Sequence, residues 1–199
     1  GLGHGDINPI IQGITVEEED TLTFTRVVKI DGASALDFSG NIIHAVNVGG
    51  GGGAVIGDAA FTGDTGVENV EVAAQHVIAA WGAAPNIGDS AEDNALEGVL
   101  HSIRHHPPNS NFPGNDGLHV RLDGLTDGEG YKLQLLFSER GVNRGFDISV
   151  NGSLIADEFT TNQGENKNFA VVHYFIADGT DVAVHLSGIG ATFADRNPI

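Results

Sequence analysis

The sequence predicts an all-β fold, an antiparallel jelly-roll β-sandwich with one long loop excursion and at most a short helix. Short runs rich in Val, Ile, Thr and Phe recur along the chain, and turn pairs such as Asp-Gly and Asn-Gly separate them. Hydrophobic residues make up 40% of the 199 residues, which is enough for a core, and the 29 glycines are spread over many turns. Strands at regular spacing with one long excursion are typical of a sandwich.

Apolar and β-branched runs mark the expected strands. The clearest turn is Asn151-Gly152, which predicts a two-residue hairpin because both residue types readily adopt a positive φ. It joins residues 147–150 to residues 153–156. We expect the other strands over residues 10–17, 21–30, 42–48, 131–137, 146–150, 169–176 and 182–186.

The middle of the chain has a different pattern. A short helix is expected within residues 67–84, over residues 71–80, although the apolar period there is poor. Residues 85–115 are rich in Pro, Asn, Asp and Gly, so we expect them to be mainly loop. Connections of this length are uncommon in a compact domain and are often functional.

The charge balance excludes several classes of partner. The chain carries 27 acidic and 9 basic residues, a formal net charge of −18. A surface this negative repels phosphate backbones and anionic membrane surfaces, so we expect no nucleic-acid partner. No apolar run reaches the roughly 18 residues needed to span a bilayer, so we expect no membrane insertion. Cations and neutral ligands such as sugars remain.

The absence of cysteine removes another set of functions. With no Cys in the chain, disulfide scaffolds, thiolate metal sites and cysteine nucleophiles are impossible. No serine has the context of a nucleophile elbow, and no motif selects one carboxylate pair from the many acidic residues. We therefore expect a protein without enzymatic activity.

Three segments together resemble the malectin-like family of carbohydrate-binding domains over roughly residues 42–199. They are the strand 43–48 with Gly49-Gly50 and its continuation to Asp64, the strand pair ending in Phe137-Ser138-Glu139 and in Val150-Asn151-Gly152, and the turn Asp195-Arg196-Asn197-Pro198. The strand pair is expected to form a hairpin, with Phe137 and Phe146 buried on one sheet face. Glu139 and Asp147 are expected to hold loops by accepting backbone N–H groups.

The resemblance implies a sugar site in the loops at one end of the sandwich. Malectin-like domains stack aromatic faces on sugar rings there and hydrogen-bond the hydroxyls. We add Trp81 and Phe112 on chemical grounds, because they are the large aromatic residues of the excursion. The positions that match by motif are Asn47, Gly49, Gly50, Arg104, His105, His106 and Asp195.

Acidic, glycine-rich loops make calcium the expected cofactor if a metal binds, since they offer oxygen ligands. Zinc is less favoured: His101 and His105 are four apart, but Pro107-Pro108 argues against a helix that would align them. The candidate calcium ligands are Asp64, Asp89, Asp93, Asp178 and Asp181.

The N-terminal segment shapes the expected domain organisation. Residues 1–41 carry the N-terminal strands, and residues 42–199 the malectin-like sandwich. Asn8-Pro9-Ile10 repeats the triplet Asn197-Pro198-Ile199, which suggests one module of a tandem array. The N-terminal strand then either closes its own sandwich or pairs with a neighbouring copy, because an open sheet edge captures strands.

We therefore expect an extracellular or cell-surface, non-catalytic module. The first hypothesis is a structural or adhesive repeat of a surface protein or filament that also binds a glycan and contacts copies of itself. The alternative is a dedicated carbohydrate-binding module of a secreted glycoside hydrolase.

Overall fold

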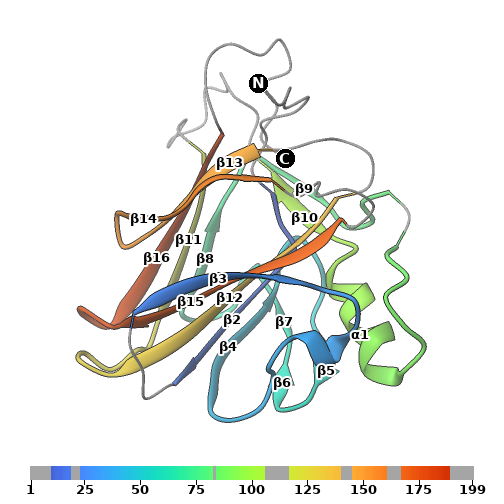
Figure 1. Cartoon of the computed structure of the whole chain (residues 1–199), viewed down its shortest axis with the longest axis horizontal. Helices are drawn as coiled ribbons and strands as arrows, with labels where there is room; N and C mark the ends of the chain where they lie inside the picture. Colours follow the sequence, from blue (N-terminus) through green and yellow to red (C-terminus); the bar gives the residue numbers. More distant parts are fainter. Residues whose placement is uncertain are drawn as a thin grey trace.

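In a computed structural model of the chain, two mainly antiparallel sheets face each other (Figure 1). A smaller layer that contains the helices covers the outer face of one of them. The structure describes residues 10–18, 23–82, 84–105, 117–139, 145–160 and 167–188. Over these residues the arrangement confirms the predicted all-β sandwich, with one short α-helix.

The first sheet has five strands in the order β14-β13-β16-β11-β8. Adjacent strands run antiparallel throughout, so one face of each strand points to the core and the other outward. Its strands are β8 (Val70–Ala73), β11 (Leu118–Asp123), β13 (Gly145–Val150), β14 (Ser153–Thr160) and β16 (Asp181–Gly188).

The second sheet has six strands in the order β3-β15-β12-β2-β4-β7, of which only the short β4–β7 pairing is parallel. Its strands are β2 (Gly13–Glu18), β3 (Phe24–Lys29), β4 (Ile42–Asn47), β7 (Thr62–Gly63), β12 (Gly130–Ser138) and β15 (Asn168–Ile176). Two small sheets contain β1 (Ile10–Ile11), β10 (Ile103–His105) and β9 (His76–Ile78), and the pair β5 (Val55–Ile56) and β6 (Ala59–Ala60).

The main core lies between the two large sheets. Its aromatic centre joins Phe137 of β12 to Phe146 and Phe159, with ring centres 5.0–5.5 Å apart. The expected hairpin of the segments ending at Glu139 and Gly152 is therefore wrong, because β12 and β13 belong to different sheets and Phe137 and Phe146 meet across the core. The Asn151-Gly152 hairpin is confirmed, with φ of 48° and 77° between β13 and β14.

A second core lies on the outer face of the six-stranded sheet. The helix α1 (Ala91–Val99) and the one-turn 3-10 helix η1 (Ala33–Ala35) cover this face. Leu96 and Val99 of α1 pack there with Leu136 of β12. A side chain at Gly13 would lie 2.7 Å from Leu136 and 2.9 Å from Val99, so glycine lets the helix approach. Covered on both faces, β12 is buried along its whole length.

The helix does not lie where the sequence predicts it. Residues 71–80 contribute to β8 and β9, because Val70 and Val72 alternate inward against the main core. The helix forms instead within residues 85–115, which were expected to be loop. Ser90 and Asp93 form a reciprocal capping box that outweighs the local excess of turn residues.

The N-terminal strand β2 belongs to its own sandwich. It lies between β12 and β4, and Leu133 is paired with Val16 at the centre of the sheet. Residues 10–18 are therefore continuous with the sheet formed by residues beyond 42.

A charged group is buried on the helix-covered face of β12. Lys132 is 1% exposed and forms ion pairs with Glu17, which is 5% exposed, and with Asp37 at 3.0 Å. Burial alone would lower the pKa of Lys132, but its hydrogen bonds with Glu17 and Asp37 raise it. Hydrogen bonds from Ser39 and Lys132 lower the pKa of Asp37 to about 2.

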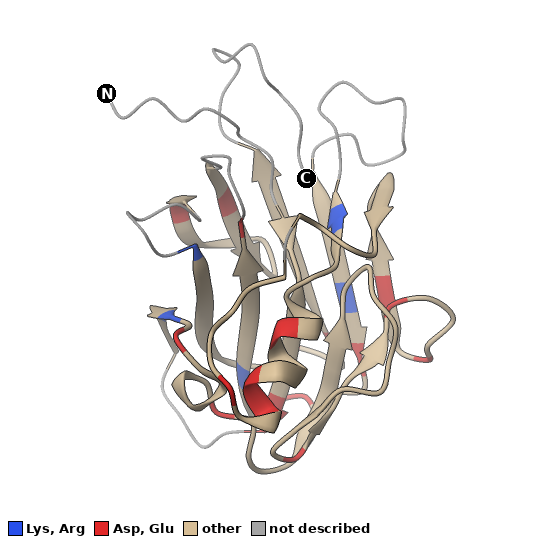
Figure 2. Ribbon diagram, turned by 90° about the vertical axis from the view of Figure 1, so that its right-hand side faces the viewer, with Lys and Arg blue, Asp and Glu red and all other residues tan. Residues whose placement is uncertain are grey.

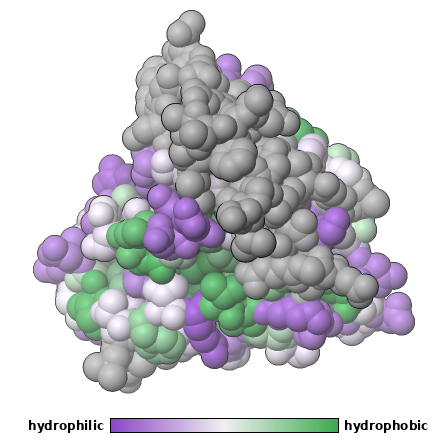
Figure 3. Space-filling view, turned by 45° about the horizontal axis from the view of Figure 1, so that its top comes forward, coloured by the Kyte–Doolittle hydropathy of each residue, from purple (hydrophilic) through white to green (hydrophobic). Residues whose placement is uncertain are grey.

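Acidic residues dominate the described surface. Figure 2 shows them on α1 and on several loops, with few basic residues between them. In the view of Figure 3, hydrophobic residues reach the surface in separate patches among hydrophilic ones. Within the described part of the chain, no helix has the length and apolar character of a membrane span.

Candidate functional site

The structure brings four of the expected sugar-binding residues together, at the end of β4 and on β10. Ser102 donates to Asn47 Oδ1 at 2.7 Å, and Asn47 Nδ2 donates to the carbonyl of Gly51 at 2.9 Å. A side chain at Gly50 would lie 2.4 Å from Asn47 Nδ2, so these groups are closely packed. The polar atoms of Asn47 thus hold the glycine-rich turn against β10.

Arg104 completes this cluster through Asp64. Its Nε and Nη2 atoms lie 2.7 and 3.0 Å from the two carboxylate oxygens, and Gly49 N–H donates to Oδ2 at 2.8 Å. Burial would raise the pKa of Asp64, but these hydrogen bonds hold it below the ordinary value. Hydrogen bonding with Asp64 likewise raises the pKa of Arg104. Asp64 therefore joins Gly49 to Arg104 of β10 through hydrogen bonds, and we call these three residues the clamp.

We expect Arg104→Met to lower the free energy of unfolding by about 2–3 kcal/mol, because it leaves Asp64 buried without its cation. The side chain of Asp64 is 3% exposed and that of Arg104 is 19% exposed. Unfolding in urea at pH 7 measures the loss, and Asp64→Asn in the same background should recover part of it.

The sign of the pH dependence provides a second test. In the wild type, the low pKa of Asp64 stabilises the fold above pH 3.8, and this contribution is lost as the pH falls through the folded pKa. In the variant, burial raises the pKa instead. The difference in stability should therefore shrink as the pH falls from 7, first through the raised folded pKa of Asp64 in the variant and then, below about pH 4, as the wild type loses its own contribution. A constant difference would argue against a charge effect.

Two of the remaining expected sugar ligands contact other described segments, although His105 follows Arg104 on β10. Trp81 is half-buried and its backbone N–H donates to the carbonyl of His101 at 2.6 Å. His105 lies across from His76 of β9, with ring centres 4.8 Å apart. His106, Phe112 and Asp195 lie outside the described residues.

The expected calcium ligands are dispersed over the fold. Asp64 belongs to the clamp, and Asp93 accepts hydrogen bonds from Ala33 N at 2.7 Å and Ser90 N at 3.1 Å. Asp181 is paired with an arginine, while Asp89 and Asp178 are exposed in separate loops. Among the described residues, no three His, Asp or Glu side chains gather into a group that could hold a metal ion.

A different set of polar residues forms an open site on the outer face of the five-stranded sheet. Strands β11 and β16 pair in register, with His119 opposite His185 and Asp123 opposite Asp181. The two imidazoles are stacked, with ring centres 4.3 Å apart and planes 7° from parallel. Because strand residues alternate in direction, these side chains share the outward face.

Arg121 stands between the imidazole pair and the aspartate pair. Its Nη2 lies 2.9 Å from Asp123 Oδ1 and its Nε 3.0 Å from Asp181 Oδ2. The bond with Asp181 and the field of both aspartates raise the pKa of Arg121. Two carboxylates directly opposite each other repel. The ion pairs of Arg121 with Asp123 and Asp181 offset this repulsion.

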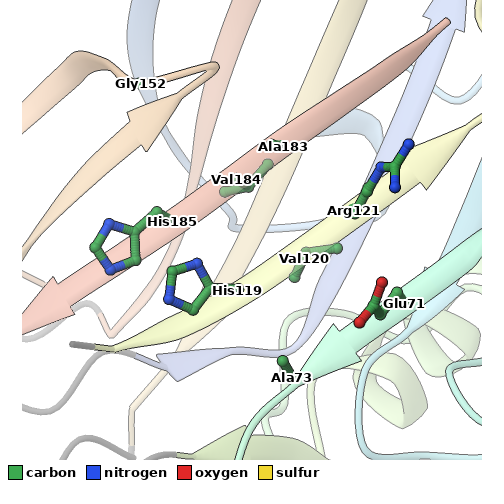
Figure 4. A pocket seen from close by; sticks show the side chains of 9 residues that line it. All are labelled: Glu71, Ala73, His119, Val120, Arg121, Gly152, Ala183, Val184 and His185. Carbon is green, nitrogen blue, oxygen red and sulfur yellow. The ribbon is translucent and has the colours of Figure 1, made fainter. Parts of the chain in front are cut away.

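Small residues leave a hollow beside these groups. Arg121 faces Ala183 across the strand pair, and His119 faces Ala73 on its other side. A cavity of about 290 Å³ opens here. Figure 4 shows the side chains that surround it. It is lined by Glu71, Ala73, His119, Val120, Arg121, Gly152, Ala183, Val184 and His185.

No family model, curated protein or solved structure matches this chain. The malectin-like resemblance therefore stays a prediction.

The sequence contains a pattern that predicts the outward face of β11 and β16. Residues 118–123 read Leu-His-Val-Arg-Leu-Asp, and residues 186 back to 181 read Leu-His-Val-Ala-Val-Asp. In an antiparallel pair these segments match residue for residue, except for Leu122 opposite Val182 and Arg121 opposite Ala183. Comparing each strand with the reversed sequence of another would identify the pair, whereas a search for local motifs does not.

Proposed function

We propose that this chain is a non-catalytic binding module that takes a neutral or amino sugar on the outer face of the five-stranded sheet. The observation that carries the proposal is the hollow over Ala73 and Ala183, flanked by stacked imidazoles on one side and by Arg121 and Glu71 on the other. Flat rings offer a face to the C–H groups of a sugar, and fixed charged groups hydrogen-bond hydroxyls.

The charges of the site select the class of sugar. Glu71, Asp123 and Asp181 stand around Arg121, and both aspartates are already paired with it. These carboxylates and the net charge of −18 would repel an anionic sugar. The cavity of about 290 Å³ lies at the small end of ligand sites, which favours one ring or the end of a chain.

The test is a glycan array followed by calorimetry with Ala183→Leu. Ala183 is exposed, so leucine should fill the hollow without disturbing the core. We expect neutral or amino sugars to bind and the variant to lose the interaction at unchanged stability. Ala60→Leu, at an exposed alanine of β6, is the matched control. Binding of uronates alone, or binding that survives Ala183→Leu, would contradict the proposed site.

A second candidate function is a structural repeat in an extracellular surface protein or filament. The edge strand β3 exposes Phe24 by 44% and Val27 by 49%, and β14 at the edge of the other sheet exposes Leu154 by 56%. Edge strands with exposed apolar residues pair with further chains. A second copy of the chain would then pair one of its strands with β3, because β2 lies inside its own sheet and has no free edge.

For this second candidate we expect Val27→Lys to abolish self-association, because an edge lysine opposes strand pairing. Sedimentation velocity over a range of concentrations measures the effect. Val55→Lys, at a residue of β5 that is 60% exposed and outside the two large sheets, should leave association unchanged. A wild-type chain that stays monomeric at every concentration would contradict this function.

A further inference from the structure

We propose that the groove between the edge strands β3 and β14 binds a small amphipathic amine, that is, a ligand with an apolar ring or chain and one ammonium group. β3 is the edge of the six-stranded sheet, and β14 is the edge of the five-stranded sheet (Figure 1). Residues of both strands line one cavity of about 540 Å³. This volume lies within the range of about 300–1,000 Å³ that is typical of small-molecule sites.

Large apolar side chains are exposed to water in this groove. Six large hydrophobic residues in the described part of the chain are strongly exposed, and three of them line the groove: Phe24 at 44%, Leu154 at 56% and Ile176 at 49%. They belong to β3, β14 and β15, so the fold brings together residues that are distant in sequence. Exposed apolar patches that polar residues surround mark binding surfaces. The apolar part of a ligand would remove this area from water.

The floor of the groove is formed by rings that the fold holds in place. His173 and Phe175 of β15 line the groove and are 6% and 5% exposed. Their planes are within 4° of parallel, with ring centres 5.8 Å apart. Thr25 of β3 lies opposite His173, and its Oγ1 is 2.8 Å from Nδ1 of the imidazole. Because these buried rings are already ordered, a ligand that binds over them loses little free energy in ordering the protein.

The charge of the groove favours a cation. Among its described lining residues Asp178 is the single acidic group, and none is a lysine or an arginine. Burial holds the pKa of His173 below its ordinary value, although a hydrogen bond with the backbone of Phe24 opposes this shift, so the imidazole is neutral at pH 7. Asp178 is exposed, in the connection between β15 and β16. Its carboxylate and the net charge of −18 attract an ammonium group and repel an anionic ligand.

The groove is separate from the proposed sugar site. The sugar site lies on the outer face of the five-stranded sheet, whereas the groove lies between the edges of the two sheets. No described residue lines both cavities. Ala183→Leu should therefore abolish sugar binding and leave amine binding unchanged, so the two proposals can fail separately.

The experiment is a nuclear magnetic resonance titration of the isotope-labelled full chain with three ligands that share a phenyl ring: 2-phenylethylamine, 2-phenylethanol and 3-phenylpropionate. We expect saturable shifts of the methyl signals of Leu154 and Ile176, with the amine as the tightest ligand and the carboxylate as the weakest. The amine should bind about 2–5-fold more tightly than the alcohol, since an exposed ion pair contributes little.

Two variants, each with a matched control, separate the apolar contribution from the charged one. Leu154→Ser should weaken the binding of the amine and of the alcohol about fivefold, whereas Val77→Ser, at a residue of β9 that is 51% exposed and outside the groove, should not. Asp178→Asn should remove the preference for the amine over the alcohol. Asp89→Asn, at an exposed aspartate of another loop, should keep that preference. Circular dichroism checks that all four variants fold.

Three results would overturn the proposal. The first is the absence of saturable shifts with any of the three ligands, and the second is a carboxylate that binds as tightly as the amine. The third is a chain that takes up no amine, dimerises in sedimentation velocity and becomes monomeric in Leu154→Ser, which would assign the groove to a second copy of the chain.

Discussion

Replacement of Lys132 by methionine is expected to lower the free energy of unfolding by about 3–5 kcal/mol, because it leaves a buried carboxylate without its cation. Lys132 lies under the helix layer at 1% exposure, and its partner Glu17 at 5%. Methionine has a similar length and fills the space, so the loss reports charge and not volume. The midpoint of urea unfolding at constant slope measures it.

Substitutions of the two partners of Lys132 are expected to lower the free energy of unfolding by smaller amounts. Glu17→Gln should cost less than Lys132→Met, because Lys132 keeps Asp37 at 3.0 Å. Asp37→Asn should cost least, since the side chain of Asp37 is 53% exposed. The double variant Glu17→Gln/Lys132→Met should be more stable than Lys132→Met alone. A double variant that shows the plain sum of both losses would argue against a coupled pair.

Replacement of Gly49 by alanine is expected to destabilise the fold by about 3 kcal/mol or more, through steric conflict and backbone strain together. Gly49 has a φ of +80°, and a Cβ there would lie 2.3 Å from the carbonyl oxygen of Ile103. That oxygen belongs to β10, so the strand that carries Arg104 has to shift. Thermal and urea unfolding measure the change.

The same glycine run contains matched controls. Gly53 has a φ of +110°, but a Cβ there would meet no atom within 4 Å, so Gly53→Ala isolates backbone strain at about 1–2 kcal/mol. Gly51 has open space and no positive φ, so Gly51→Ala should stay within about 0.5 kcal/mol. If all three variants were alike, the close approach of Gly49 to β10 would not matter to stability.

The parts of the fold that were predicted correctly depend on local chemistry. The Asn151-Gly152 turn is specified by the two residues that form it, and it appears with positive φ at both. The helix α1 was missed because its composition is that of a loop. It depends on a cap at Ser90 and on the burial of Leu96 and Val99 against a sheet distant in sequence.

Sheet partners and the site could not be predicted from local patterns. β12 and β13 were expected to pair because the malectin-like pattern joins these two segments in a hairpin, yet each is placed by other strands. The strand β11 was not predicted at all, so His119 had no expected partner. Asn47 and Arg104 were expected among the glycan-binding residues. In the structure Asn47 contacts Ser102 and the carbonyl of Gly51, and Arg104 contacts Asp64.

The central position of β2 has a consequence for the order of folding. Its partners on β12 lie more than 110 residues further along the chain, with Val16 opposite Leu133. During synthesis, residues 13–18 must wait until the segment 130–138 has left the ribosome before the middle of the sheet can close. Pairing over such separations makes folding slow. A hydrophobic strand that waits this long is where we expect a chaperone to act on the nascent chain.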